Sequence, residues 1–392
     1  MSKVIMIGCD LHDATMRLRM AADAEESVGK SFPTADVPAT LSWMRDFAGK
    51  HGASRIVLAY EASGQGFGLY DVLSDAGIEC YVLAPTHLPH TAHRRKNKTD
   101  DKDALMVLDE VRGHVLAGRK LPAVWVPDPQ TRDDRELVRM RLELGEARTR
   151  TKNQIRHLAK RSKVAFPVWF TKSGNWSKRS LAWLTEVAAG TTGNLATGVR
   201  TALTSLLAVY HEFSRQLSDL DKAVAKLARH DRYVEAFRKL KLMAGVGTLT
   251  AMTFLTELGD LARFANRRQL AAYLGLAPAA FESGQCNDRK GHITRQGPAR
   301  VRHMLCQAAW AALRASAEWR ATYEKLKRGS AKRSKVAIVA IMRKLAIAMW
   351  HTARSKELDG LLEEIDHERT SAPARQKGPP LRALRPRSAC GG

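Results

Sequence analysis

The first third of the chain alternates short apolar runs with stretches of helical periodicity. Apolar and β-branched runs predict strands over Val4–Cys9, Thr15–Met20, Val28–Phe32, Arg55–Tyr60 and Glu79–Leu83. Apolar residues at helical spacing predict helices over residues 38–48, 68–76 and 102–116. Three closely connected strands followed by alternating helices and strands indicate a mixed α/β sheet covered by helices.

Beyond residue 120 the pattern becomes mainly helical. The Pro-rich segment 121–129 predicts a linker, and residues 131–163 and 197–241 predict two long helical arms. Apolar residues three or four apart, such as Leu217, Leu220 and Val224, favour an antiparallel coiled coil between the arms. Residues 164–196 show no clear period and receive no assignment. The expected organisation is an α/β domain over 1–120, linker and arms over 121–241, a compact helical domain over 242–355 and a basic, disordered tail over 356–392.

Charge narrows the class of partner. The 392 residues include 64 Lys and Arg against 40 Asp and Glu, giving a formal net charge of +24 and a pI near 10.1. Such a balance indicates nucleic acid first and an anionic membrane surface second. We find no apolar stretch near the ~20 residues of a membrane span, and no signal peptide. Five scattered cysteines without a Cys-x-x-Cys pair argue against a disulfide framework or zinc site, and favour the cytoplasm.

Four carboxylates stand out against this basic background. Asp10 and Glu61 end two of the predicted strands, and Asp100 and Asp103 lie three residues apart on one face of a predicted helix. Carboxylates are the hard oxygen ligands that hold magnesium, and two ions ~4 Å apart stabilise both oxygens of a phosphodiester displacement. The grouping therefore predicts a metal site for nucleic-acid phosphates. Asp101 is an alternative to Asp100 in another helical register.

Two residues beside Asp10 are open to more than one interpretation. His12 and Asp13 follow the first predicted strand and lie close enough to support the metal ligands from outside the first shell. The alternative for His12 is a turn residue with no chemical role.

The order of these motifs carries a resemblance to a known family. Gly8-Cys9-Asp10, Tyr60-Glu61-Ala62-Ser63-Gly64 and Lys98-Thr99-Asp100-x-x-Asp103-Ala104 resemble the DEDD transposases of bacterial insertion sequences. This is the IS110 family with its IS1111 group, and it includes the Piv-type DNA invertases. The resemblance extends to about residue 355. It implies an RNase H-like (RuvC-like) first domain with Asp10, Glu61, Asp100 and Asp103 as catalytic metal ligands, a coiled-coil connection and a carboxy-terminal transposase domain.

The same resemblance singles out a serine in the second half of the chain. Ser283-Gly284 followed by Gly291-x-Ile293-Thr294-Arg295-x-Gly297 resembles the motif of the family's transposase domain, whose serine is the proposed nucleophile. A serine hydroxyl needs a base or a metal for activation. We therefore expect Ser283 to be catalytic together with the carboxylates, if the domains or two subunits bring them together.

Several further residues are predicted to contact nucleic acid. Gly245-x-Gly247 resembles the turn of a helix-hairpin-helix element, whose backbone N–H groups bind phosphate, and the alternative is a helix cap with Thr248. The basic residues predicted to contact phosphates are Arg94, Arg95, Lys96, Lys98, Arg148, Arg150, Lys152, Arg156, Arg295, Arg300 and Arg302.

The leading hypothesis is a magnesium-dependent DNA transposase or recombinase, cytoplasmic in a bacterium and associated with the nucleoid when bound. The resemblance implies a noncoding bridge RNA as guide, with element ends and target DNA as substrates. The two helical arms favour a homo-oligomer, dimer or tetramer, and the lack of an apolar span predicts no membrane partner. The enzyme alternative is a Piv-type invertase or junction-resolving nuclease that uses the same carboxylates. The non-enzyme alternative is an inactive nucleic-acid-binding protein.

Overall fold

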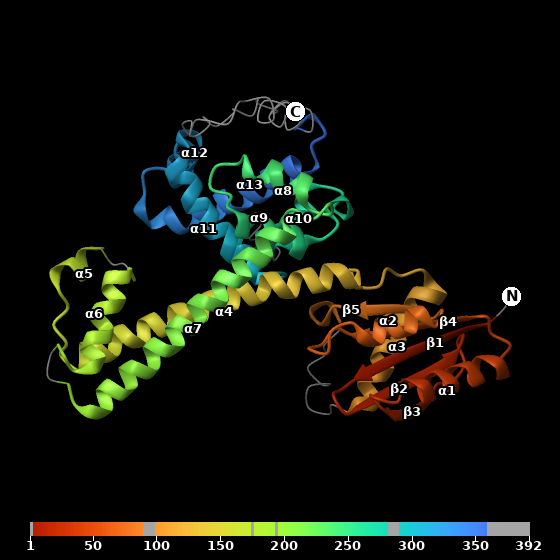
Figure 1. Cartoon of the computed structure of the whole chain (residues 1–392). Coiled ribbons are helices and arrows are strands. Elements are labelled where there is room, and N and C mark those ends of the chain that lie inside the picture. The colour runs from red at the N-terminus through yellow and green to blue at the C-terminus, as the bar shows by residue number, and fades with distance from the viewer. Residues whose placement is uncertain (1–2, 89–98, 174–175, 193–194, 281–289, 359–392) are drawn as a thin grey trace. The chain divides into compact units, whose positions relative to one another are not determined.

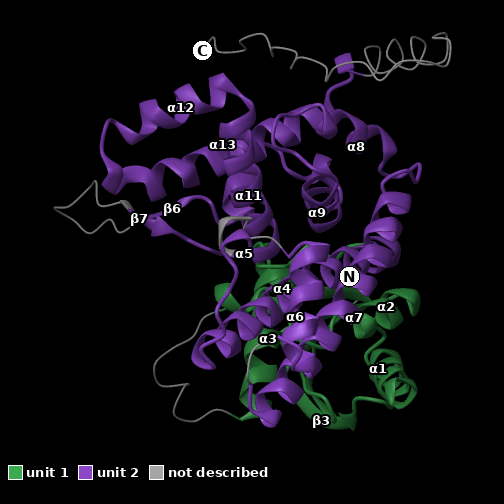
Figure 2. Cartoon of the chain, turned by 60° about the vertical axis from the view of Figure 1, so that its left-hand side comes forward, with its two compact units in different colours: residues 1–127 green, residues 128–392 purple. Residues whose placement is uncertain are grey.

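The computed structural model describes residues 3–88, 99–173, 176–192, 195–280 and 290–358. The chain divides into two compact units, residues 1–127 and 128–392, which Figure 2 shows in different colours. The mixed α/β prediction for the first part and the mainly helical prediction for the rest are both confirmed.

The first unit is built on one five-stranded sheet with the order β3-β2-β1-β4-β5. β1 pairs antiparallel with β2 and parallel with β4, so the sheet is mixed. β2 and β3 are antiparallel, whereas β4 and β5 are parallel. The strands are β1 (Val4–Leu11), β2 (Thr15–Ala22), β3 (Val28–Pro33), β4 (Arg55–Glu61) and β5 (Glu79–Leu83). All five predicted strands are confirmed.

Helices cover both faces of this sheet. α1 (Val37–Lys50) and α2 (Gly68–Asp75) share one apolar cluster with Ile7, Leu58 and other residues of one face. α3 (Asp100–Ala117) contributes to a second cluster with Met6 and Val57 on the opposite face. Side chains alternate between faces along a strand, which explains why β1 and β4 are apolar at successive positions. The short 3-10 helix η1 (Pro85–His87) follows β5.

The segment predicted as a linker begins as part of the sheet edge. Ala123 bridges Leu83 of β5, and the amide of Val124 donates to the carbonyl oxygen of Val82 at 2.8 Å. Leu121 is buried in the cluster beneath α3. Residues 121–124 therefore belong to the first unit, because they satisfy the outer hydrogen-bonding groups of β5.

Two long helices run side by side in the second unit (Figure 1). They are α4 (Pro129–Arg161) and α7 (Thr197–Leu227), and α7 ends 14 residues before the predicted limit of the second arm, with α8 (Val234–Lys241) following. Arg141 of α4 pairs with Asp221 of α7, whereas Ile155 shares a cluster with Leu207, so the helices are antiparallel. Buried α7 residues recur every seven positions, at Leu203, Tyr210, Leu217 and Val224.

The unassigned segment between the arms forms a small aromatic core. α5 (Val168–Ser173) and α6 (Lys178–Ala189) place Phe170 and Trp183 with their ring centres 5.6 Å apart. Their cluster includes Ile155 of α4 and Leu207 of α7, so it closes one end of the helical pair.

The remaining helices enclose a single large core. It is formed by residues of α8, α9 and α11–α13, together with ends of α4 and α7. The elements are α9 (Thr248–Leu258), η2 (Leu261–Arg263), α10 (Arg267–Tyr273), β6 (Pro278–Ala280), β7 (Lys290–Ile293), α11 (Ala299–Ala315), α12 (Ala317–Lys327), η3 (Ala331–Arg333) and α13 (Ser334–Arg354). β6 and β7 pair antiparallel.

Among the described helices, the stretch Ala331–Arg354 is long and apolar enough to cross a membrane by length and composition alone. The sequence prediction that no stretch comes near this length was therefore wrong. α13 nevertheless packs against α8, α11 and α12, and contributes Ile341, Leu345 and Met349 to the core. Its apolar composition is thus explained by burial within the second unit.

Candidate metal site and its basic surroundings

Asp10 and Glu61 occupy equivalent positions at the carboxyl ends of neighbouring parallel strands. Cys9 of β1 is paired with Tyr60 of β4, and each carboxylate is the next residue along its strand. Cys9 and Tyr60 belong to the cluster under α1 and α2. Because side chains alternate, Asp10 and Glu61 lie on the opposite face, which α3 covers.

α3 brings the other two carboxylates to this end of the sheet. Thr99 caps the helix by accepting from the amide of Lys102, and the first turn contains Asp100 and Asp103. Acidic residues are favourable there because the helix dipole is positive at its N-terminus. The helix ends at Gly118 in the left-handed conformation, with φ +66°.

Gly8 determines how closely α3 approaches the sheet. A Cβ atom at Gly8 would lie 2.1 Å from the carbonyl oxygen of Ala104 and 2.2 Å from the amide nitrogen of Leu108. The backbone of α3 therefore rests directly on β1, two residues before Asp10. One helical turn separates Ala104 from Asp100, and two strand residues span a similar distance, so the carboxylates converge.

The convergence is visible in the contacts of His12. Its Nε2 atom lies 3.0 Å from Oδ2 of Asp10 and 3.6 Å from Oδ1 of Asp100. One potential ligand atom from each of these three residues lies within 4.8 Å of the others. The cluster thus combines β1, the turn after it and the first turn of α3.

Electrostatics at this cluster disfavour ionisation of Asp10. Burial is the main cause that raises the pKa of its carboxyl group, and the negative charges of Asp103 and Asp100 raise it further. His12 acts in the opposite direction through its charge and hydrogen bond. A cation placed among these carboxylates would relieve the repulsion, which is the expected electrostatics of a metal site.

Asp101 faces a different partner from its neighbours. Both Nε and Nη2 of Arg17 donate to its Oδ1 atom, at 2.8 and 2.6 Å, and Arg19 lies 3.4 Å from its Oδ2 atom. These arginines come from β2, on the same face of the sheet as α3. The carboxylate of Asp101 is therefore neutralised by β2, which supports Asp100 as the metal ligand.

The turn after β1 is tied to the loop after β4. Nε2 of Gln65 donates to Oδ1 of Asp13 at 3.1 Å, and the amide of Gln65 donates to the hydroxyl of Ser63 at 3.3 Å. Asp13 thus bonds to the next loop, whereas His12 faces the carboxylates. The sequence places both residues close to Asp10 but does not distinguish their partners.

Comparisons with known proteins agree with this geometry. Residues 7–163 match a family model described as transposase of the DEDD IS110 type, and residues 238–324 match the transposase IS116/IS110/IS902 family. A putative transposase y4qE of Sinorhizobium fredii is 29% identical over 76% of this chain and 75% of its own length. The transposase of insertion sequence element IS1533 of Leptospira borgpetersenii is 24% identical over 79% of this chain and 86% of its own length.

The chain belongs to the IS110 family of transposases. It is therefore an enzyme that cleaves and rejoins DNA. The four carboxylates lie within the first matched segment, and the second matched segment begins in α8 and ends in α12.

Part of the transposase's predicted site lies outside the described residues. Ser283 falls within 281–289, and Arg94, Arg95, Lys96 and Lys98 fall within 89–98. Ala280 and Lys290, on either side of the segment with Ser283, are paired in the hairpin of β6 and β7.

The predicted basic contacts on α4 lie near the aromatic core. Lys152 is 5.7 Å from the ring centres of both Trp176 and Tyr210, and Arg156 is 5.7 Å from the ring centre of Trp176. Burial, followed by the charges of Arg148 and Arg156, lowers the pKa of Lys152. Arg150 is exposed.

The basic residues of the second matched segment have different surroundings. Arg302 donates through Nη1 to the carbonyl oxygens of Leu274, Gln296 and Gly297, so it holds the turn before α11. Arg300 pairs with Glu143 of α4. Arg295 is exposed and has a positive φ of 57°.

Gly245 has a structural reason for being glycine. Its φ is +83°, and an added Cβ would lie 2.5 Å from the carbonyl oxygen of Ala308 in α11. Gly247 is exposed and caps α9, which begins at Thr248, so the expected cap at Thr248 is displaced by one residue. Close packing against α11 and the positive φ therefore explain why residue 245 is glycine. Gly247, in contrast, lies at the surface.

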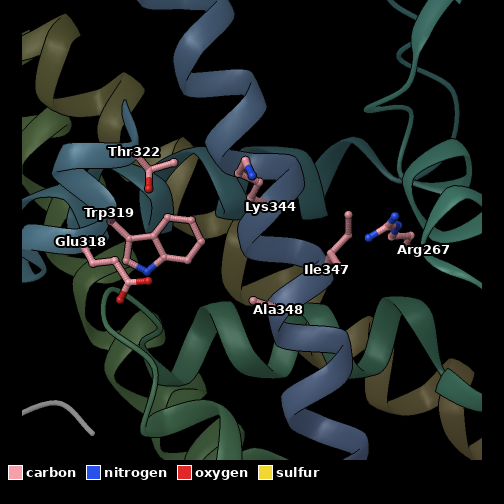
Figure 3. Close-up of a pocket in the computed structure, with 7 residues that line it drawn as sticks. All are labelled: Arg267, Glu318, Trp319, Thr322, Lys344, Ile347 and Ala348. Atoms are coloured by element: carbon pink, nitrogen blue, oxygen red, sulfur yellow. The ribbon is translucent and has the colours of Figure 1, made fainter. Parts of the chain in front are cut away.

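A cavity of about 350 Å³ lies in the second unit (Figure 3). Trp319 of α12 and Lys344 and Ile347 of α13 line it, with Arg267 at the start of α10. Glu318 is the one acidic residue in this lining. The cavity therefore lacks a second carboxylate with which to hold a metal ion.

Proposed function

We propose that this transposase cleaves and rejoins DNA through a metal site formed by Asp10, Glu61, Asp100 and Asp103, on an RNase H-like sheet. The observation that carries the proposal is the convergence of the first turn of α3 on the carboxyl end of β1, where Glu61 occupies the equivalent position on the neighbouring strand β4. The strand order β3-β2-β1-β4-β5, in which β2 alone runs antiparallel to the rest of the sheet, supports the fold assignment.

The donor set fits magnesium, because all four carboxylates offer the hard oxygen atoms that this ion prefers. Two Mg²⁺ ions bound there would polarise the scissile phosphate and stabilise the entering and leaving oxygens. The raised pKa of Asp10, caused by burial and by Asp103 and Asp100, supports the need for a compensating cation. The chain's own contribution is to hold these carboxylates on rigid strands and on a capped helix.

We assign the nucleophile to Ser283. Its hydroxyl oxygen would attack phosphorus, so that a serine–phosphate bond forms as the bond to the departing DNA strand breaks. The hydroxyl proton leaves to a base, and the departing oxygen takes up a proton. The phosphoserine link retains the energy of the broken bond for the rejoining step.

The test compares Ser283→Ala with Asp10→Asn and with Ser205→Ala, which removes an exposed hydroxyl on α7. Strand exchange should fall at least a hundredfold in the first two variants and stay at the wild-type level in the third. Wild-type enzyme should give a covalent protein–DNA adduct on denaturing gels, and Ser283→Ala should not. Full strand exchange by Ser283→Ala would refute the nucleophile, and cleavage without any adduct would favour a water-dependent nuclease.

The partners we propose are the element ends, the target DNA and a noncoding bridge RNA, bound by a homo-oligomer in the bacterial cytoplasm. Lys152 and Arg156 lie on one helix beside Trp176, and Arg148 lies one turn earlier on the same helix, which supports a phosphate-binding surface. Pull-down of the transposase with transcripts of the element ends tests the RNA. Binding equal to that of an unrelated RNA of the same length would count against a guide.

A further inference from the structure

We propose that His12 is a nitrogen ligand of the metal site, which makes the site favour first-row transition ions such as Co²⁺ and Mn²⁺ over Mg²⁺. This inference rests on the proposed carboxylate site. Its direct support is the position of Nε2 of His12, 3.0 Å from Asp10 Oδ2 and 3.6 Å from Asp100 Oδ1. An imidazole nitrogen between two carboxylates is a mixed donor set.

The spacing along the chain explains why the ring points to the carboxylates. Asp10 is the last but one residue of β1 and His12 is the first residue after the strand, and the contact of its ring with Asp10 places the ring on the Asp10 side of the sheet. Gly8, two residues earlier, lies against α3 on that face. His12 therefore continues the row of positions that α3 covers.

The backbone of His12 is held at both of its polar groups. Its amide donates to the carbonyl oxygen of Thr15 at 2.9 Å, and the hydroxyl of Thr34 donates to its carbonyl oxygen at 2.7 Å. These bonds fix the turn independently of the ring. The position of the imidazole is thus set by its two side-chain torsions alone, which limits the entropy lost on ligation.

The neighbouring Asp13 provides the contrast within the same turn. Its carboxylate accepts from Gln65, whereas the contacts of the His12 ring are the carboxylates of the proposed site. Magnesium favours oxygen ligands and water, whereas imidazole increases affinity for later first-row ions. His12 therefore changes which ion the site prefers, without replacing any of the four carboxylates.

Calorimetric titration of the full chain with Co²⁺, Mn²⁺ and Mg²⁺ measures this preference. His12→Ala should weaken Co²⁺ binding by about tenfold or more, and Mg²⁺ binding by less than about threefold. His157→Ala removes an exposed histidine from α4 and should change neither affinity. His12→Asp supplies oxygen in place of nitrogen and should lower the ratio of Co²⁺ to Mg²⁺ affinity.

Pulsed electron paramagnetic resonance of bound Mn²⁺ tests the bond itself. Nitrogen coupling should be present in the wild type and in His157→Ala, and absent in His12→Ala. If His12→Ala keeps both the coupling and the Co²⁺ affinity, His12 is not a ligand. If Asp10→Asn also leaves all three affinities unchanged, the proposed carboxylate site fails as well, so the two failures are distinguishable.

Discussion

Replacing Gly8 with alanine tests the contact that brings the carboxylates together. The new Cβ would lie 2.1 Å from Ala104 O and 2.2 Å from Leu108 N, whereas ordinary van der Waals contact begins at 3.4 Å. α3 would have to move away by about 1.3 Å, because the obstructing atoms belong to its backbone and cannot rotate aside. Overpacking of this kind costs about 1–3 kcal/mol, and the rigid obstruction favours the upper end.

The assay is hydrogen exchange of the amides of α3. This measurement reports on the stability of the first unit separately from that of the second. A loss of about 3 kcal/mol corresponds to exchange faster by roughly a hundredfold, since every 1.4 kcal/mol is tenfold. Strand cleavage should fall by a similar factor, because a shift of about 1 Å in catalytic groups costs about a hundredfold.

Gly49→Ala is the matched control in the same unit. Gly49 lies in the last turn of α1, and an added Cβ there meets no atom within 4 Å. Alanine is about 1 kcal/mol better than glycine inside a helix, so this variant should be as stable as the wild type or slightly more stable. Wild-type protection and cleavage in Gly8→Ala would refute the close packing of α3 on β1.

Three further predictions concern charge. Asp10→Asn should stabilise the metal-free protein at pH 7 by about 0.5–2 kcal/mol in thermal unfolding. The raised pKa of Asp10 means that its ionised carboxylate destabilises the folded wild type, so the gain should shrink as the pH falls and the carboxyl group becomes protonated. Arg139→Ala should lower the free energy of unfolding in urea by about 3–5 kcal/mol, because the carboxylate of Glu257, 6% exposed, loses its two hydrogen bonds of 2.7 and 3.0 Å from Arg139. Adding Glu257→Gln should recover part of this loss, since it removes the buried unpaired charge. Arg150→Gln with Arg156→Gln should reduce the salt dependence of DNA affinity by about two units of slope, and an unchanged slope would exclude phosphate contacts there.

The strands of the sheet could be predicted from the sequence because each one is an apolar run that is recognisable by itself. Apolar runs such as Val4–Cys9 are buried on both faces, and such runs have few alternatives to a central strand. The carboxylates Asp10 and Glu61 were predictable for the same reason, since each follows directly on such a run. Ser283 remains a prediction from resemblance.

The contacts that distinguish neighbouring polar residues were not predictable from the sequence. Asp100 and Asp101 are adjacent and chemically identical, and only the position of Arg17 across the sheet separates them. His12 and Asp13 differ in the same way, through Gln65 in a distant loop. Periodicity assigns a residue to a face, but its partner depends on tertiary packing.

The pairing of Asp101 with arginine also bears on the charge of the proposed metal site. Three acidic residues occupy the first turn of α3, and together with Asp10 and Glu61 they would place five negative charges at one end of the sheet. Arg17 and Arg19 approach Asp101 from β2, so its charge is balanced within the protein. The four carboxylates that remain carry a charge equal and opposite to that of two divalent cations. Removing Arg17 and Arg19 together would add a fifth uncompensated charge to a cluster where like charges already raise the pKa of Asp10, and would strengthen cation binding while weakening the metal-free fold.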